Sequence, residues 1–285
     1  MMVPTLVLNG LTQGALFFVL GSGLTLAFGL MQVVNLSHGA FYLLGGYVAF
    51  TVLKLTGSWL LAVAAAGASI AVLGVVFERT MLARVRSGGD LSQTLLTVAL
   101  SMVIADLALA VWGGHPLSIR APLAVARPVT LLGITYPGFR YVLMGTSVVI
   151  ASGLWLILYR TRFGIAVRAS VDDRETVSAL GVRIDTIYSL MFMLSALLAG
   201  VAGALGGTYL QLSPGEDTTI LTYSLVVIIV GGLGSLLGTV VSSLLLGQVL
   251  SFSLAYAPEY SMFLVFVPMA IVLAVRPQGL FGRTA

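Results

Sequence analysis

Charged residues are scarce in this chain. Lys, Arg, Asp and Glu together make up 8% of its 285 residues, whereas 59% are hydrophobic. A water-soluble domain normally has about a quarter of its residues charged, and a chain with so few charges cannot cover its surface against water. Its outer surface must therefore face lipid, and the sequence predicts a polytopic membrane protein.

The residues that catalytic and metal sites use are also scarce. There is no cysteine, which excludes disulfides and thiolate metal sites, and there are only two histidines. No HExxH motif occurs and no serine has a GxSxG setting, so we expect neither an enzyme nor a metal site. The glycines of "GGLGSLLG" (231–238) have neither the GxGxxG spacing nor the Lys-Ser/Thr ending of a nucleotide-binding loop. We therefore expect that the chain itself binds no ATP and no other cofactor.

Runs without charge divide the chain into membrane passes. Residues 1–53 carry no charge and as helix would extend about 80 Å, more than two crossings of a ~30 Å hydrocarbon core. Residues 218–258 would extend about 60 Å and must fold back once. Single passes are expected at the remaining uncharged runs, which are 55–77, 91–112 (interrupted by Asp106), 141–159, 186–215 and 260–275. Since backbone groups in lipid must be satisfied internally, we expect an all-α transmembrane bundle of eight or nine passes in a single domain, residues 1–285.

Basic residues indicate the orientation of the bundle. The net charge is +4, no run of basic residues occurs and the first basic residue is Lys54, so we expect no nucleic-acid partner and no cleavable signal peptide. Eight arginines lie in the loops 78–90 and 160–185, which are two passes apart and therefore share a side. The positive-inside rule makes this side cytoplasmic. The loop 113–140, on the other side, contains three arginines and no acid, which argues against this assignment. The eight arginines of the first two loops outnumber these three, so the assignment is kept.

The most polar stretch is "FGIAVRASVDDRETVSALGVRIDTI" (163–187). Asp172 followed by Glu175 resembles a capping box with Asp in place of the usual Ser or Thr, and Gly181 suits the position just after a helix. The intervening "RETVSAL" predicts about two helical turns with Val177 and Leu180 on one side. A short capped helix at the membrane surface is suited to docking a partner, although any long inner loop can form one.

Three stretches resemble the permease subunits of branched-chain amino acid ABC importers, in the larger family that includes ribose-type permeases. The first, residues 8–50, contains an Asn-x-x-His-Gly element at Asn35, His38 and Gly39. The second is the polar stretch just described, and the third is "VGGLGSLLGTVVSSLLLG" (230–247). The resemblance covers nearly the whole chain, and the three motifs follow in the same order with matching spacing. Many relatives carry an acidic residue after His-Gly, whereas Ala40 follows here, so no role of that carboxylate is carried over.

The resemblance implies a coupling element that inserts into a groove of a cytoplasmic ATPase subunit. Residues that would fall on this element, in the coupling loop 160–185, are Arg168, Ala169, Asp172, Asp173, Glu175, Ala179 and Gly181. The resemblance also implies a second, homologous permease, two ATPase subunits that bind ATP with Mg²⁺, an external or periplasmic solute-binding protein, and the bacterial cytoplasmic membrane. Branched-chain or other hydrophobic amino acids are the leading substrate class, with urea, amides and aromatic acids as alternatives.

Polar residues and glycines inside the passes are the candidates for the translocation path. Asn35, Ser37 and His38 should face the bundle interior or a wet cavity because unpaired polar groups are costly in lipid. Together with the following Gly39, these residues favour a discontinuous helix at the translocation path. The alternative is that Asn35 and His38 only bond a neighbouring helix and hold the turn, and we favour this role slightly over contact with the substrate. Six glycines are expected either to let helices pack closely, through small-xxx-small spacing, or to break a helix at the path. They are Gly203, Gly207, Gly231, Gly232, Gly234 and Gly238.

A transporter or channel that works alone is the main rival. Such proteins use intramembrane charges for ion coupling, and here Asp106 is the one acid inside a predicted pass. Asp106 lies about two turns before Gly113, so we expect it to be shallow and paired with an arginine. The lack of ionisable groups favours the ABC importer.

Overall fold

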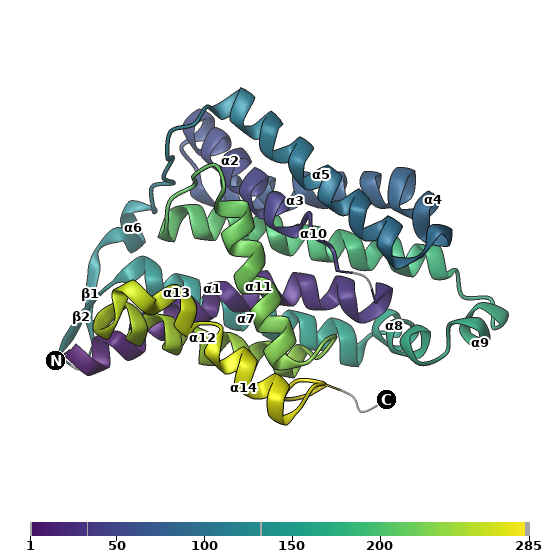
Figure 1. The fold of residues 1–285 in the computed structure, drawn as a ribbon. Coiled ribbons are helices and arrows are strands. Elements are labelled where there is room, and N and C mark those ends of the chain that lie inside the picture. Colours follow the sequence, from purple (N-terminus) through teal and green to yellow (C-terminus); the bar gives the residue numbers. More distant parts are fainter. Residues whose placement is uncertain (1, 33, 132, 283–285) are drawn as a thin grey trace.

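The computed structural model describes residues 2–32, 34–131 and 133–282, and this part of the chain is almost entirely helical (Figure 1). The predicted all-α membrane bundle is confirmed. The long helices are α1 (Met2–Met31), α2 (His38–Thr56), α3 (Trp59–Phe77), α5 (Gly89–Trp112), α7 (Gly138–Arg160), α10 (Ile184–Tyr209), α11 (Glu216–Gly231) and α12 (Leu236–Tyr256). The shorter elements are the π-helical turn η1 (Glu78–Leu82), α4 (Ala83–Val85), the 3₁₀ turn η2 (Arg86–Gly88), α6 (Leu123–Ala126), β1 (Pro128–Leu131), β2 (Ile134–Pro137), α8 (Arg162–Asp172), α9 (Arg174–Ala179), the 3₁₀ turn η3 (Pro258–Tyr260), α13 (Ser261–Leu264) and α14 (Val267–Val275).

Eight helical stretches of the described residues are long and apolar enough to cross a membrane. They are α1, α2, α3 with its continuation to Val85, α5, α7, α10, α12 and the stretch Pro258–Val275. α11 has 16 residues, about 24 Å of helix, and is shorter than the ~30 Å hydrocarbon core. The predicted number of eight or nine passes is therefore confirmed, with α11 as a ninth, shorter helix, and residues 218–258 do fold back once.

Helices α1 and α10 form the centre of the bundle. They lie side by side, as Figure 1 shows, and are buried along most of their length, with α2, α3 and α12 packed on them. In contrast, α5, α7 and α14 are largely exposed. At one end of the bundle α8 and α9 project, and at the opposite end lie α6 and the antiparallel hairpin β1–β2, which was not predicted. We call these the α9 end and the hairpin end.

The predicted helix break near the N-terminus is present, and it places the start of α2 inside the bundle. Residues 34–37 are not helical. They run back from the α9 end beside α5, where the Leu36 N–H donates to Thr97 Oγ1 at 3.2 Å. α2 then begins at His38, whose Nε2 lies 2.9 Å from the carbonyl oxygen of Leu20, near the middle of α1. Helix α2 therefore starts at about half the depth of the bundle.

Helix α11 also starts inside the bundle, next to the start of α2. The carbonyl of Asp217, in the first turn of α11, lies so close to Gly39 that a Cβ there would collide with it. From this point α11 runs obliquely across the bundle, at a steep angle to α1 (Figure 1). Two helix N-termini therefore meet at mid-depth.

Glycines bring the central helices into backbone contact. A Cβ at Gly203 of α10 would collide with the carbonyl oxygen of Tyr42 in α2, and one at Gly45 would lie 2.5 Å from the Cα of Gly200. A Cβ at Gly207 would meet side chains at 2.9 Å. Because a methyl group does not fit against the facing backbone at Gly203 or Gly45, these glycines set the distance between α2 and α10.

A second glycine cluster joins α11 to α12. Gly231 and Gly238 touch backbone to backbone, so they lie at a helix contact. Gly232 and Gly234 lie in the turn between the helices with φ angles of +102° and +78°, a conformation that residues with a side chain rarely adopt. These two glycines therefore lie at a helix break.

Two expectations about charged residues are wrong. Asp106 forms no ion pair with an arginine among the described residues, because it lies on an exposed face of α5 that points away from the bundle. Residues 78–88, which belong to a loop in the sequence-based prediction, continue α3 as the helical turns η1, α4 and η2. The physical reason is that Glu78 finds partners within the bundle and is buried there.

The Gly203 contact gives a stability prediction. In Gly203→Ala the new methyl group has to push the backbone of α2 away, and overpacking of this kind costs about 1–3 kcal/mol. Gly145 of α7 is the matched control, since a Cβ there meets nothing within 4 Å. We expect a lower thermal unfolding midpoint in detergent for Gly203→Ala and an unchanged or slightly higher one for Gly145→Ala. Equal midpoints would contradict the tight contact between α2 and α10.

Candidate functional site

The polar stretch that the sequence singled out forms two helices, not one. α8 is capped by Thr161, whose Oγ1 accepts a hydrogen bond from the Gly164 N–H at 3.1 Å. Arg168 on α8 donates to the carbonyl of Leu158 and lies with its Cζ 5.0 Å from the ring centroid of Tyr159. These contacts hold α8 against the end of α7, so that α9 is the part that projects farthest (Figure 1).

Helix α9 is capped at both ends. The carboxylate of Asp173 accepts hydrogen bonds from the N–H and the hydroxyl of Thr176 at 3.0 and 2.5 Å. These bonds lower the pKa of Asp173, so the charged cap is present at neutral pH and is lost only as the pH falls through this lowered pKa. At the other end Gly181, with φ +87°, donates to Ser178 O, while Val182 donates to Val177 O. This pattern is a Schellman motif.

The capping box predicted at Asp172 is therefore wrong. Asp172 is the last residue of α8, and the adjacent Asp173 caps α9. The chain breaks between the two helices at Asp173, which has an extended conformation with φ −150° and ψ 96°. Of the residues proposed for coupling, Arg168, Ala169 and Asp172 lie on α8, whereas Asp173, Glu175, Ala179 and Gly181 belong to α9 or its caps.

The surface of α9 is almost fully exposed. Val177 is buried, but Leu180 is 78% exposed. The expectation that Val177 and Leu180 lie on the same side of the helix is therefore wrong. Asp173, Glu175, Ala179 and Gly181 are also exposed. The helix therefore presents acidic side chains at its start and a bare leucine at its end.

The polar element at the start of α2 is fully internal. Asn35, Ser37 and His38 are each at most 3% exposed. Asn35 Oδ1 accepts from the backbone N–H and the hydroxyl of Ser37 at 3.1 and 2.6 Å, and His38 donates from Nε2 to Leu20 O. Asn35 Nδ2 and His38 Nδ1 have no hydrogen-bond partner among the described residues. These hydrogen bonds stabilise the turn before α2 and attach it to α1. Within the described part of the chain, Asn35 Nδ2 and His38 Nδ1 remain unpaired at about half the depth of the bundle.

The first turn of α11, which carries two acids, lies beside this element. Glu216 and Asp217 form this turn and are half-buried, and the backbone carbonyl of Asp217 faces Gly39. Negative charge at a helix N-terminus is favourable. In the sequence these two acids served only to separate uncharged runs, although two adjacent acids directly before a long apolar run could have indicated a buried helix start.

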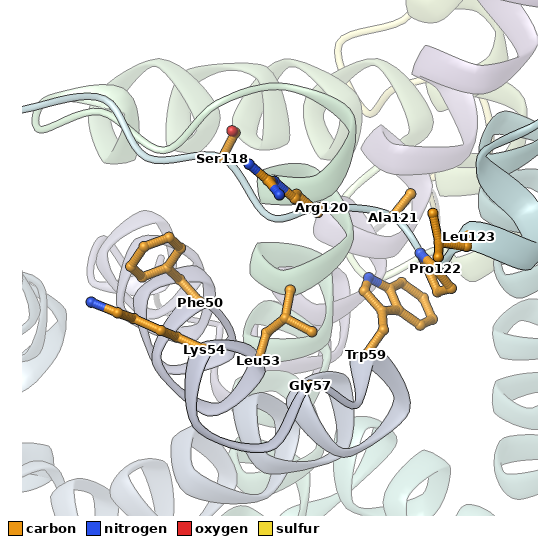
Figure 2. A pocket seen from close by; sticks show the side chains of 10 residues that line it. All are labelled: Phe50, Leu53, Lys54, Gly57, Trp59, Ser118, Arg120, Ala121, Pro122 and Leu123. Carbon is orange, nitrogen blue, oxygen red and sulfur yellow. The ribbon is translucent and has the colours of Figure 1, made fainter.

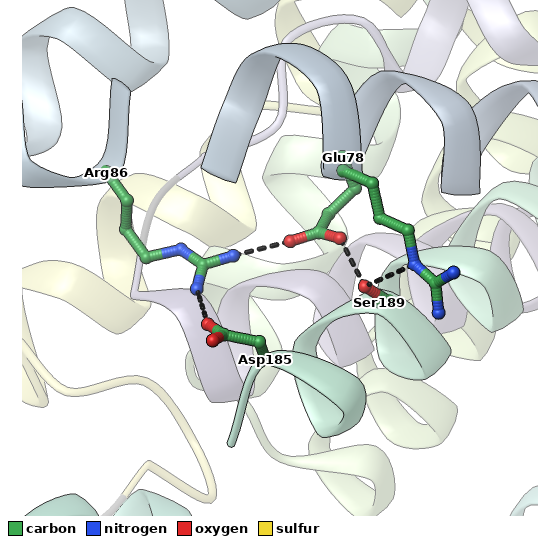
Figure 3. Close-up of polar contacts among 5 residues, drawn as sticks. Glu78, Arg86, Asp185 and Ser189 are labelled. Atoms are coloured by element: carbon green, nitrogen blue, oxygen red, sulfur yellow. Dashed lines mark hydrogen bonds and ion pairs between the residues drawn. The ribbon is translucent and has the colours of Figure 1, made fainter. Parts of the chain in front are cut away.

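Charged side chains tie the α9 end of the bundle together (Figure 3). Arg86 Nη2 lies 2.5 Å from Glu78 Oε1, and Arg86 Nη1 lies 2.7 Å from Asp185 Oδ1. The second oxygen of Glu78 accepts from Ser189, which also accepts from Arg79 Nε at 3.3 Å. The Glu78 side chain is 1% exposed. The sequence does not predict this network, although an acid directly after a long apolar run, as at Glu78, could have indicated a buried carboxylate.

Cavities open near both ends. At the α9 end a cavity of about 540 Å³ is bordered by α1, α8 and the turn between α11 and α12, and includes Thr25, Gln32 and Arg168. At the hairpin end a cavity of about 560 Å³ lies between the α2–α3 turn and residues 118–123 (Figure 2). Its lining is mostly apolar but includes Lys54 and Arg120.

A comparison with protein families decides the class of this bundle. Residues 6–273 match the model of the branched-chain amino acid transport system permease component. The chain belongs to this permease family. It is therefore a transport subunit of the ABC permease type and has no catalytic function of its own, as predicted.

Relatives agree with this assignment along almost the whole permease. It is 27% identical to the high-affinity branched-chain amino acid transport system permease protein BraD of Pseudomonas aeruginosa, over 96% of this chain and 94% of the relative. It is 26% identical to the corresponding protein LivH of Escherichia coli K12, with the same coverage. The ribose import permease protein RbsC of Escherichia coli K12 is 25% identical over 84% of this chain and 74% of its own length.

A solved structure has a similar fold. The permease superimposes on a chain of PsaBC from Streptococcus pneumoniae, solved in complex with Fab, with a TM-score of 0.51 and 12% identity. The match covers 96% of the permease and 92% of that chain. At this identity the likeness concerns the arrangement of helices only.

The cap of α9 gives a prediction for the permease alone. Asp173→Ala removes the side chain that accepts the Thr176 hydrogen bonds, whereas Asp173→Ser keeps an oxygen that can cap. We expect the amides of residues 176–180 to exchange several-fold faster in Asp173→Ala than in the native chain, with Asp173→Ser close to native. Hydrogen–deuterium exchange in detergent measures this difference. If both variants exchanged at the native rate, the cap would not be what holds α9.

Proposed function

We propose that this permease is one transmembrane subunit of an ABC importer that moves branched-chain or other hydrophobic amino acids inward. Separate ATPase subunits, which bind ATP and Mg²⁺, would supply the energy. The observation that carries the proposal is α9, a short helix capped at both ends that projects from the bundle and exposes Leu180. A short projecting helix that is fixed at both ends and presents an apolar side chain among charged ones suits insertion into a groove of another protein.

The orientation follows from the arginines. The α9 end holds the two arginine-rich loops of the positive-inside assignment and would face the cytoplasm, where an ATPase has access to ATP. We place the protein in the bacterial cytoplasmic membrane, together with a second homologous permease and two ATPase subunits. Arg168, Ala169, Asp172, Asp173, Glu175, Ala179 and Gly181 would lie at or beside the ATPase contact.

The hairpin end would then face outward and receive the solute-binding protein. Lys54 and Arg120 border its cavity, and neither forms an ion pair within the part of the chain that the structure describes. Cations without acidic partners complement an acidic protein surface. Arg120 lies on the loop that covers the cavity (Figure 2), where a docked protein would reach it.

The translocation path would pass the two helix starts at mid-depth. Asn35, Ser37, His38 and Gly39 meet the first turn of α11 there, and broken helices at half the membrane depth are typical of substrate sites in transporters. The unpaired Nδ2 of Asn35 and Nδ1 of His38 are the polar atoms that a solute or a water would contact. The cavity at the α9 end, which reaches from Thr25 to Gln32 along α1, would be the exit.

The substrate class rests on the names of the relatives. BraD and LivH are branched-chain amino acid permeases, whereas the ribose permease RbsC matches over a shorter part of its length. Urea, amides and aromatic acids are the alternatives within the family. A transporter or channel that works alone is the remaining rival, and dependence on ATP separates it from the importer.

The docking of α9 predicts a selective effect of Leu180. Leu180→Asp places a charge where the ATPase groove would bury the leucine. Leu180 is the C-cap residue of α9, but only its backbone takes part in the cap hydrogen bonds, so the substitution leaves these bonds in place. We expect co-purification of the ATPase subunits and solute uptake to fall about ten-fold or more, as for the loss of a central interface anchor. Leu91→Asp is the matched control, because Leu91 is 72% exposed at the same end of the bundle, on α5. Equal losses in both variants, or none in Leu180→Asp, would contradict the docking.

The function itself is tested by reconstitution. Proteoliposomes containing the complete complex, with its binding protein outside, should take up leucine, isoleucine or valine when ATP is enclosed, and not when ADP replaces it. Urea, acetamide, benzoate and ribose test the alternatives. Arg120→Glu should lower the stimulation of ATP hydrolysis by the binding protein.

Two results of the reconstitution would overturn the proposal. Uptake by the permease chain alone, driven by an ion gradient, would exclude the importer. Uptake of ribose or urea in place of the amino acids would keep the importer but exclude the proposed substrate class.

A further inference from the structure

Helix α9 has few attachments to the bundle, and one of them is an aromatic ring of α10. Among the residues of α9, Val177 is the buried one. The guanidinium of Arg174, the first residue of α9, lies with its Cζ 5.1 Å from the ring centroid of Tyr188. This distance is within the range of a cation–π contact. A displacement of α9 would therefore act on Tyr188 directly.

The same ring holds a second cation from a different part of the chain. The Cζ of Arg86 lies 4.3 Å from the Tyr188 ring centroid. Tyr188 itself is 6% exposed, so this contact is shielded from water and is stronger than at an open surface. One ring on α10 thus joins two arginines, Arg174 from α9 and Arg86 from the turn between α3 and α5.

Arg86 connects the Tyr188 ring to the helical turn that continues α3. Its ion pairs with Glu78 and Asp185 fix η2 to η1 and to the start of α10 (Figure 3). The Glu78 carboxylate is almost fully buried, and a buried charge that loses its partner is strongly unfavourable. Arg86 and Glu78 are therefore expected to move together. The π-helical turn that carries Glu78 also interrupts the regular α-helix here, and such turns are frequent at functional positions.

We propose that Tyr188 is a positioning residue for energy coupling. Its ring links Arg174 on α9 to the Arg86–Glu78 pair, so that a movement of α9 is transmitted to the turn between α3 and α5 and to the start of α10. We call the series Arg174, Tyr188, Arg86 and Glu78 the Tyr188 bridge. This inference rests on the proposed docking of an ATPase subunit on α9.

Tyr188 is the best member of the bridge to change. Replacing Arg86 or Glu78 alone leaves a buried charge without its partner, and such a variant can fail simply because it does not fold. Tyr188→Leu removes the ring but leaves the Glu78–Arg86 pair and its hydrogen bonds in place. Tyr188→Phe is the matched control, since it keeps the ring that faces both guanidinium groups.

The first test uses the complete complex in proteoliposomes and measures solute uptake per ATP hydrolysed. We expect Tyr188→Phe to keep the native ratio, and Tyr188→Leu to lower it about five-fold or more, the low end of the range for coupling between sites. The amount of assembled complex should be the same in both. A loss of assembled complex in Tyr188→Leu, with an unchanged ratio in what remains, would show a structural role only and would overturn the inference.

The second test uses the permease alone and does not depend on the proposed function. In Tyr188→Leu we expect faster amide exchange both in residues 174–180 and in residues 78–88, whereas Tyr188→Phe should exchange as the native chain does in both segments. Faster exchange confined to the neighbourhood of residue 188 would contradict the bridge.

The two proposals fail in different ways. If the native complex takes up solute without ATP, the proposed function is wrong. If the native complex needs ATP but Tyr188→Leu and Tyr188→Phe behave alike in both measurements, the function stands and the Tyr188 bridge is wrong.

Discussion

A bilayer offers no hydrogen-bond partner to a buried polar group, and this constraint organises the whole bundle. The internal serines and threonines largely donate to nearby carbonyls, as Ser224 does to Ile220 and Ser242 to Val227. At the helix break, residues 34–37, Asn35 Oδ1 accepts from Ser37 and His38 Nε2 donates to α1, whereas Asn35 Nδ2 and His38 Nδ1 have no partner among the described residues. Because apolar side chains gain little by leaving lipid, close packing must supply the rest of the stability, and the glycine contacts of α2 with α10 and of α11 with α12 supply it.

Helix α10 connects the two regions that the proposed function needs. Near its first turns, at the α9 end, it carries Asp185 and Tyr188, which contact Arg86. Half-way along, the carbonyl of Ser195 lies beside Gly23, where the His38 ring also packs. Farther along, Gly203 touches the backbone of α2. A rigid helix with these contacts can carry a displacement at α9 to the mid-depth meeting point of α2 and α11, which is the proposed path.

The sequence predicted the architecture well, because absence of charge and helix length are properties of the chain itself. Runs without charge located the passes, and the break near Asn35 was visible as polar residues in a stretch too long for two spans. What could not be predicted depended on contacts between distant segments. Asp172 and Asp173 are equally good caps by type, and only the folded loop shows that α8 continues through Asp172. Likewise, the position of Glu78 directly after a long apolar run could have indicated a buried acid, but nothing in the sequence pairs it with Arg86 and Ser189.

The central claim is that α9 is held in an ATPase subunit, and photo-crosslinking tests it directly. The chain contains no cysteine, so Leu180→Cys provides a single attachment point for a benzophenone maleimide in the complete complex. The account predicts a covalent adduct between residue 180 and an ATPase subunit, with a yield that changes between the ATP-bound and nucleotide-free states, and no such adduct from the same probe at Leu91→Cys. An intact, transporting complex in which the probe at residue 180 labels no ATPase subunit in any nucleotide state would contradict it.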